Sequence, residues 1–141
     1  MASSHYEKYL YIRTEADEDD DDDAARSIAL PSSRITAIAP SAAGTLTIWF
    51  ESVNNIHTEG DDELVLKDSV VLNVTTHRHK EVASRIIQAI NGTRNLSDGW
   101  IVVADDTTTD FSGSTRSAVY LHNDITSVGP INIAPANSKN Y

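Results

Sequence analysis

The chain of 141 residues contains no cysteine, few aromatic residues and no long hydrophobic run. Without cysteine it has no disulfide framework, no thiol nucleophile and no thiolate metal site. No apolar run approaches the ~18–20 residues that a membrane helix requires, so we expect no membrane partner. The six glycines are scattered and form no phosphate-binding or dinucleotide-binding motif. Aromatic residues make up only 6%, which leaves little for sugar stacking in a glycosidase cleft.

An excess of basic residues is also missing. The chain has 11 Lys and Arg against 21 Asp and Glu, a net charge of −10. Eight of these acids lie in the nine positions 15–23, and the 13 others nearly balance the 11 basic residues. The sequence therefore describes a near-neutral domain with one acidic insert. Net negative charge disfavours direct binding to a nucleic-acid backbone.

The apolar pattern predicts a mainly β protein. Alternating or continuous apolar residues, rich in β-branched and aromatic side chains, indicate strands at 6–14, 34–39, 45–51, 68–75, 99–104, 116–122 and 124–134. We expect Gly129-Pro130 to interrupt the last of these strands. The short apolar run at 64–66 indicates a further short strand. Residues 27–30 are a short apolar stretch that Pro31 interrupts.

One segment, His77 to Ile90, predicts an amphipathic helix. Its apolar stripe contains Val82, Ala83, Ile86, Ile87 and Ile90. We expect the Thr76 hydroxyl to cap its start and Asn91-Gly92 to end it in a left-handed turn.

These elements predict the α+β class, with a mainly antiparallel β-sheet of about six to seven strands and one helix packed on one face. The length fits a single β-rich domain, 1–141. Within it we expect an acidic, solvated loop at 15–23 and a polar C-terminal tail at 135–141.

The acidic insert has several interpretations. A solvated loop is the ordinary behaviour of like charges in sequence. An intersubunit electrostatic contact through Asp19, Asp20, Asp21 and Asp22, a cation site and a DNA mimic are the alternatives. The calcium helix-loop-helix pattern needs a central glycine and a terminal glutamate, and the insert has neither.

Basic residues gather at the start of the predicted helix, where Arg78 and Lys80 are followed by Arg85. Cations at a helix N-terminus oppose the helix dipole, so helix formation does not explain them. They either tolerate an exposed helix start or contact acids, including the acidic insert of a neighbouring copy. His77 and His79 would point about 200° apart on a helix and cannot share a metal ion there.

Other candidate sites are weaker. The oxygen-rich run Asp105 to Asp110 follows a buried strand and is either a polar loop or a cation or catalytic site. No Gly-x-Ser-x-Gly elbow is present, so we expect no catalytic residues, no metal and no cofactor. The aromatic side chains are core or interface anchors, and Tyr6, Tyr9, Tyr11 and Trp49 are our interface candidates.

Five segments carry a resemblance to a known family: Ile28–Ser33, Leu46–Glu51, Asp68–Leu72, His79–Val82 with Ala89–Asn91, and Gly99–Asp106. In these the chain resembles a family of small proteins encoded by marine tailed bacteriophages, chiefly those of cyanobacteria. Members of that family are mostly uncharacterised or are virion structural proteins. The resemblance implies a structural role and carries no functional residues, and the acidic insert is not part of the pattern.

The resulting hypothesis is a phage virion structural protein that is not an enzyme. Its most concrete form is a capsid decoration (cement) protein that binds the major capsid protein in many copies, as a homo-oligomer, in virions assembled in the host cytoplasm. The alternatives are a tail, neck or head–tail connector component, and a non-virion host-interaction protein that uses the acidic loop. Exposed sheet edges suit symmetric assembly, in which many weak contacts add.

Overall fold

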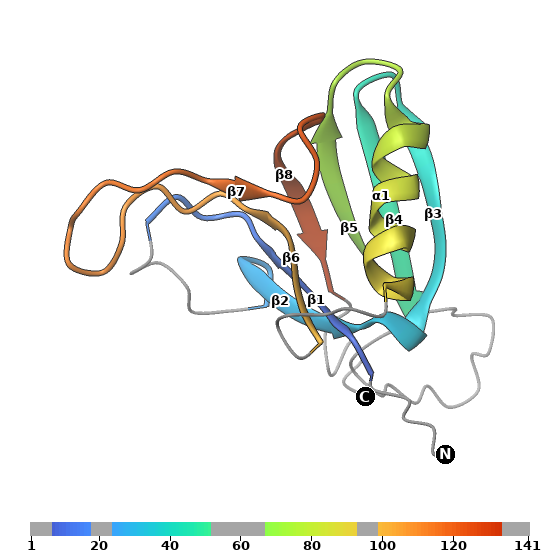
Figure 1. Cartoon of the computed structure of the whole chain (residues 1–141), viewed down its shortest axis with the longest axis horizontal. Helices are drawn as coiled ribbons and strands as arrows, with labels where there is room; N and C mark the ends of the chain where they lie inside the picture. Colours follow the sequence, from blue (N-terminus) through green and yellow to red (C-terminus); the bar gives the residue numbers. More distant parts are fainter. Residues whose placement is uncertain (1–6, 18–23, 52–66, 93–98, 134–141) are drawn as a thin grey trace, which may run out of the picture.

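The computed structural model describes residues 7–17, 24–51, 67–92 and 99–133 (Figure 1). The described strands form two sheets of four strands each. The first has the order β2-β1-β6-β7, with β2 Ser27–Pro31, β1 Tyr9–Arg13, β6 Trp100–Asp105 and β7 Val119–Tyr120. The second has the order β3-β4-β5-β8, with β3 Ile35–Ala42, β4 Thr45–Glu51, β5 Lys67–Val74 and β8 Ile125–Asn132. A short 3-10 helix, η1 (Ser32–Arg34), joins β2 to β3.

The α+β class and the single helix are confirmed. The second sheet is antiparallel throughout. In the first sheet β1 is antiparallel to β2 but parallel to β6, a pairing between strands far apart in the chain. The division into two sheets and this parallel pair were not predicted. The expected strand at 64–66 and the tail at 135–141 lie outside the described residues.

The core lies between the inner faces of the two sheets and is completed by the helix. The first sheet contributes Leu10, Ile12, Leu30 and Val103, and the second contributes Ile48, Phe50, Val70 and Leu72, all with no exposed surface. Helix α1 (His79–Asn91) contacts β3 of the second sheet and β6 of the first. Its buried side chains, Val82 and Ile86, therefore close the core between the sheets.

The ends of α1 differ from the prediction. The helix begins at His79, after a turn in which His77 has a positive φ of 65°, and its N-cap is Arg78 rather than Thr76. Gly92 is extended, with φ −67°, so the expected left-handed stop is wrong. The Gly92 carbonyl instead accepts a hydrogen bond from the Lys8 ammonium, which satisfies a polar group at the helix end.

Gly129-Pro130 does not interrupt β8, which continues to Asn132. The two residues form a bulge opposite Val71, because Val128 pairs with Leu72 and Ile131 with Val70. A Cβ at Gly129 would lie 3.1 Å from the Val71 side chain, so any larger residue there would require Val71 or the bulge to shift. Pro130 is tolerated because β8 is an edge strand of its sheet.

Residues 106–118, between β6 and β7, form an arm that extends away from the sheets at the left of Figure 1. The arm runs beside the chain that follows β1, since the N–H groups of Thr108 and Thr109 donate to the Ala16 carbonyl at 2.8 and 3.0 Å. Its two sides are joined where the Arg116 N–H donates to Thr108 O at 2.8 Å. Of the strand predicted at 116–122, residues 116–118 belong to the arm, and Val119–Tyr120 form the part that pairs with β6 as β7.

Candidate interaction surface

An aromatic row lies on the outer face of the first sheet. Tyr9 is opposite Trp100 in the β1–β6 register, and Tyr11 is two residues further along β1. The Tyr11 and Trp100 rings stack with centroids 5.0 Å apart and planes 29° apart. Alternate residues of a strand point to opposite faces, and Leu10 and Ile12 take the inner face. The three aromatic side chains consequently share the outer face.

The row is open to solvent. Tyr9 is 41% exposed and Trp100 is 46% exposed, which is unusual for side chains of their size. Their neighbours across the outer face are small or aliphatic, namely Ala29 opposite Tyr11 on β2 and Val102 opposite Tyr11 on β6. Because aromatic side chains are enriched in protein interfaces, this face is the strongest candidate for a contact with a partner.

Local backbone contacts fix the positions of the aromatic residues. Gly99 has φ +95°, which favours glycine, and its carbonyl accepts the Tyr9 N–H at 2.7 Å. Nearby, the Glu7 carboxylate accepts hydrogen bonds from the Ser33 N–H and hydroxyl, both at 3.0 Å. The Ser33 N–H is the main cause that lowers the pKa of Glu7. These contacts hold the backbone beside Tyr9 and Trp100 to neighbouring segments.

At its other end the row stops at the base of the arm. Arg13 lies two residues after Tyr11 and so points to the same face of β1, but its side chain is only 3% exposed. Its guanidinium donates to the Asp17 carbonyl at 2.9 Å and, more weakly, to the Glu15 carbonyl at 3.4 Å. The first residues of the predicted acidic loop are therefore bound to the sheet end.

Sequence analysis identified part of this surface. Tyr9 and Tyr11 were predicted as interface residues and lie together. Trp100 was read only as a core or interface anchor, because the continuous apolar run from Gly99 to Ala104 indicated burial on both faces. In the structure Trp100 and Val102 alternate with the buried Ile101 and Val103, but all four residues are apolar, so the sequence carries no signal that separates the two faces.

Trp49 belongs to a different surface. It lies on the outer face of the second sheet, opposite Ala37 and Ser69, and is 39% exposed. The face around it is polar, with Thr47 bonded to Ser41 at 2.8 Å. Trp49 is thus an isolated aromatic side chain, separate from the row.

The basic residues at the helix start are partly explained within the chain. The Arg78 guanidinium donates to the Asp124 carboxylate at 2.9 Å and lies 3.6 Å from Glu81. The bond from Arg78 lowers the pKa of Asp124, and Asp124 in turn raises the pKa of Arg78. Lys80 and Arg85 have no ion-pair partner among the residues that the structure describes.

The run Asp105 to Asp110 uses its carboxylates for internal contacts. Asp105 accepts the Thr107 N–H at 3.0 Å and lies 3.6 Å from Arg116. Asp110 accepts the Ser112 and Ser114 N–H groups, both at 2.9 Å, and the Ser112 hydroxyl at 2.6 Å. The Ser112 hydroxyl is the main cause that lowers the pKa of Asp110. These contacts support the polar-loop interpretation.

The described ranges contain no group of three or more His, Asp or Glu side chains placed to hold a metal ion. They also contain no helix long and apolar enough to cross a membrane. Tyr6 and the acidic residues Asp19 to Asp22 lie outside the described residues, so their predicted interface roles stay predictions.

Comparisons with known proteins add no identification. No protein-family model, no curated protein and no solved structure matches the chain.

Proposed function

We propose that the protein is a structural component of a tailed-phage virion. In the most concrete form it decorates the capsid, binding the major capsid protein in many copies. The supporting observation is the aromatic row formed by Tyr9, Tyr11 and Trp100, which exposes a largely apolar face. Aromatic side chains at the centre of an interface commonly contribute most of its binding energy.

Two further features agree with an assembling protein. The sequence segments that suggested a resemblance to small marine-phage proteins, which are mostly uncharacterised or virion structural, form β2, β4, β5, α1 and β6. Repeated copies on a regular shell also need little affinity each, because neighbouring contacts act together. A modest exposed face is then sufficient for a decoration protein.

The first experiment counts the protein in purified virions by quantitative mass spectrometry. A capsid decoration protein is expected in numbers close to those of the major capsid protein. A neck or connector component would instead be present only in the copy number of a single ring per particle. Absence from the virion would contradict both and would favour the host-interaction alternative.

A second experiment tests the aromatic row. Shells lacking the protein are incubated with the purified wild-type chain, with Tyr9→Ser, with Trp100→Ser, and with Trp49→Ser as the matched control. We expect the first two variants to co-sediment at least about tenfold more weakly, while the control binds as the wild type does. Equal loss for all three variants, or no loss for any, would contradict the assignment of the row.

A further inference from the structure

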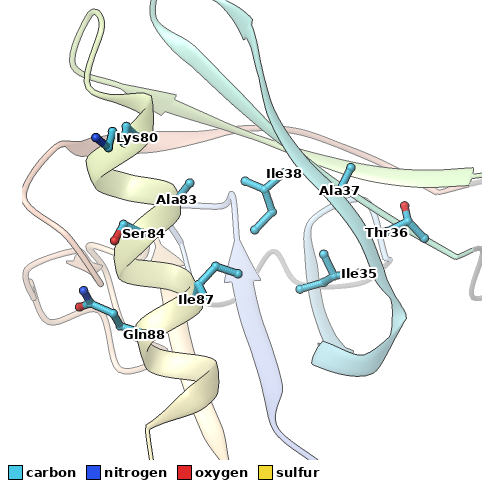
Figure 2. Close-up of a pocket in the computed structure, with 9 residues that line it drawn as sticks. All are labelled: Ile35, Thr36, Ala37, Ile38, Lys80, Ala83, Ser84, Ile87 and Gln88. Carbon is cyan, nitrogen blue, oxygen red and sulfur yellow. The ribbon is translucent and has the colours of Figure 1, made fainter.

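A second surface lies in a groove between α1 and β3 (Figure 2). The groove has a volume of about 610 Å³, and its apolar lining includes Ile35, Ile38, Ala83 and Ile87. Ile87 is 45% exposed although it belongs to the predicted apolar stripe of the helix. An apolar groove of this size is large enough to receive an aromatic side chain.

The helix side of the groove also carries a positive charge. Lys80 lies on the same helix face as Ile87, seven residues earlier, and both line the groove. Lys80 is exposed and has no ion-pair partner within the described part of the chain. An occupant that combines an apolar group with an adjacent carboxylate would complement this groove.

The tip of the arm has this combination of groups. Phe111 is 76% exposed, the highest value among the large hydrophobic side chains described. It follows Asp110, whose carboxylate holds the turn by accepting the N–H groups of Ser112 and Ser114. The tip therefore presents a phenyl ring beside a carboxylate in a turn with fixed hydrogen bonds.

The arm of a molecule is far from its own groove. Figure 1 shows the arm at one end of the long axis, while α1 and β3 lie at the other end. A contact between the two surfaces consequently joins different copies. Such a contact uses two different patches, so it either forms twice in a reciprocal two-fold dimer or continues head to tail into a ring or filament.

We propose that Phe111 of one copy inserts into the groove between α1 and β3 of a second copy, with Asp110 facing Lys80. The interaction buries the exposed Phe111 side chain against the exposed Ile87 and the half-buried Ile35 and Ile38. It also pairs a lysine that has no ion-pair partner among the described residues. It is independent of the aromatic row and does not rest on the virion role.

Cross-linking tests the geometry directly, because the chain has no native cysteine. One preparation carries Ser114→Cys at the arm tip, a second carries Ser84→Cys in the groove lining, and they are oxidised separately and as a mixture. Both variants keep Phe111 and Ile87, so the proposed contact can still form. We expect disulfide-linked dimers mainly in the mixture, each with one chain of each kind. Dimers in the Ser114→Cys sample alone at the same yield would indicate an arm-to-arm contact. That result, or no dimer in any sample, would overturn the proposal.

Association in solution gives an independent test by sedimentation velocity over a range of concentrations. We expect the wild-type chain to self-associate, as a reciprocal dimer or a larger assembly, and Phe111→Ser or Ile87→Ser to raise the dissociation constant at least about 30-fold. A mixture of the two variants should form only a dimer, because one partner supplies the arm and the other the groove. A wild-type chain that stays monomeric would overturn the proposal.

Controls separate the groove from the rest of the surface. Trp49→Ser removes an exposed aromatic side chain elsewhere and should leave association unchanged. Lys80→Glu should weaken association several-fold, whereas Arg85→Glu, the same charge change on α1 outside the groove lining, should have a smaller effect. Circular dichroism confirms that each variant is folded. Equal effects of Lys80→Glu and Arg85→Glu would contradict the pairing with Asp110.

Discussion

The Tyr120 hydroxyl donates a hydrogen bond of 2.5 Å to Oδ1 of Asp106, whose Oδ2 accepts the Val128 N–H at 3.1 Å. Tyr120 belongs to β7 of the first sheet and Val128 to β8 of the second. One carboxylate therefore connects the two sheets at the base of the arm. This contact gives a small polar group a role in holding together two layers that otherwise meet through apolar packing.

Removal of the Tyr120 hydroxyl should destabilise the protein. A hydrogen bond to a charged carboxylate contributes about 1.5–3 kcal/mol, and partial exposure of this pair places Tyr120→Phe near the lower end of that range. Urea unfolding followed by tryptophan fluorescence measures the change. Tyr11→Phe is the control, since no described hydrogen bond involves its hydroxyl. Equal stability of Tyr120→Phe and wild type would show that the bond contributes nothing.

The raised pKa of Tyr120 predicts that the free energy of unfolding falls at alkaline pH. Burial and the bond to Asp106 raise the pKa of Tyr120 above its ordinary value of 10.0. The contribution of Tyr120 is complete below pH 10 and is lost as the pH rises further, because only the unfolded chain then releases the phenolic proton. The stability difference between wild type and Tyr120→Phe should shrink from pH 9 to pH 11 in thermal unfolding. A difference that grows with pH would contradict this sign.

Gly129 should not tolerate a side chain. A Cβ there would lie 3.1 Å from both the Val71 side chain and its carbonyl oxygen, so Gly129→Ala forces the bulge in β8 to move. We expect a loss of about 1–3 kcal/mol in the free energy of unfolding. Gly44→Ala is the matched control, because its Cβ would meet only the Val74 carbonyl at 3.5 Å. Similar losses for both variants would exclude the steric explanation.

Neighbouring isoleucines of α1 should respond in opposite ways to a charge. Ile86 has no exposed surface, so Ile86→Asp places a carboxylate in the core and should prevent soluble folding. Ile87 is 45% exposed, and Ile87→Asp should fold with little loss of stability. Soluble expression and circular dichroism make the comparison. A soluble, folded Ile86→Asp would contradict the core position of this helix face.

Local patterns were sufficient to predict most elements of the fold. The alternation around Ile48 and Leu72 and the four-residue spacing of Val82 and Ile86 predicted β4, β5 and α1, because burial of one face produces these periods directly. The α+β class followed from them. The pairing of β1 with β6 depends on contacts between segments about ninety positions apart, and no local period encodes such a pairing.

The surfaces were less predictable for a related reason. The helical stripe did not distinguish the buried Ile86 from the exposed Ile87. The exposure of Ile87 arises because β3, the strand beside the helix, is the edge strand of its sheet and does not cover this side chain. Phe111 lies in a polar loop whose sequence gives no sign that it extends from the sheets. Arg78 was expected at an exposed helix start or in contact with acids, and its partner Asp124 became visible only when β8 was placed beside β5.

The parallel pairing of β1 with β6 also constrains the order of folding. The strands β3, β4 and β5 are close in sequence and pair as neighbours, so their part of the second sheet can form while the chain is being synthesised. β1 emerges first but lacks one of its two partners until residue 105 has been made. At typical elongation rates of ~5–20 residues per second, that interval lasts on the order of 5–20 seconds. During it the nascent chain carries an unpaired strand edge, and we expect the rate of folding to be set by closure of this long loop.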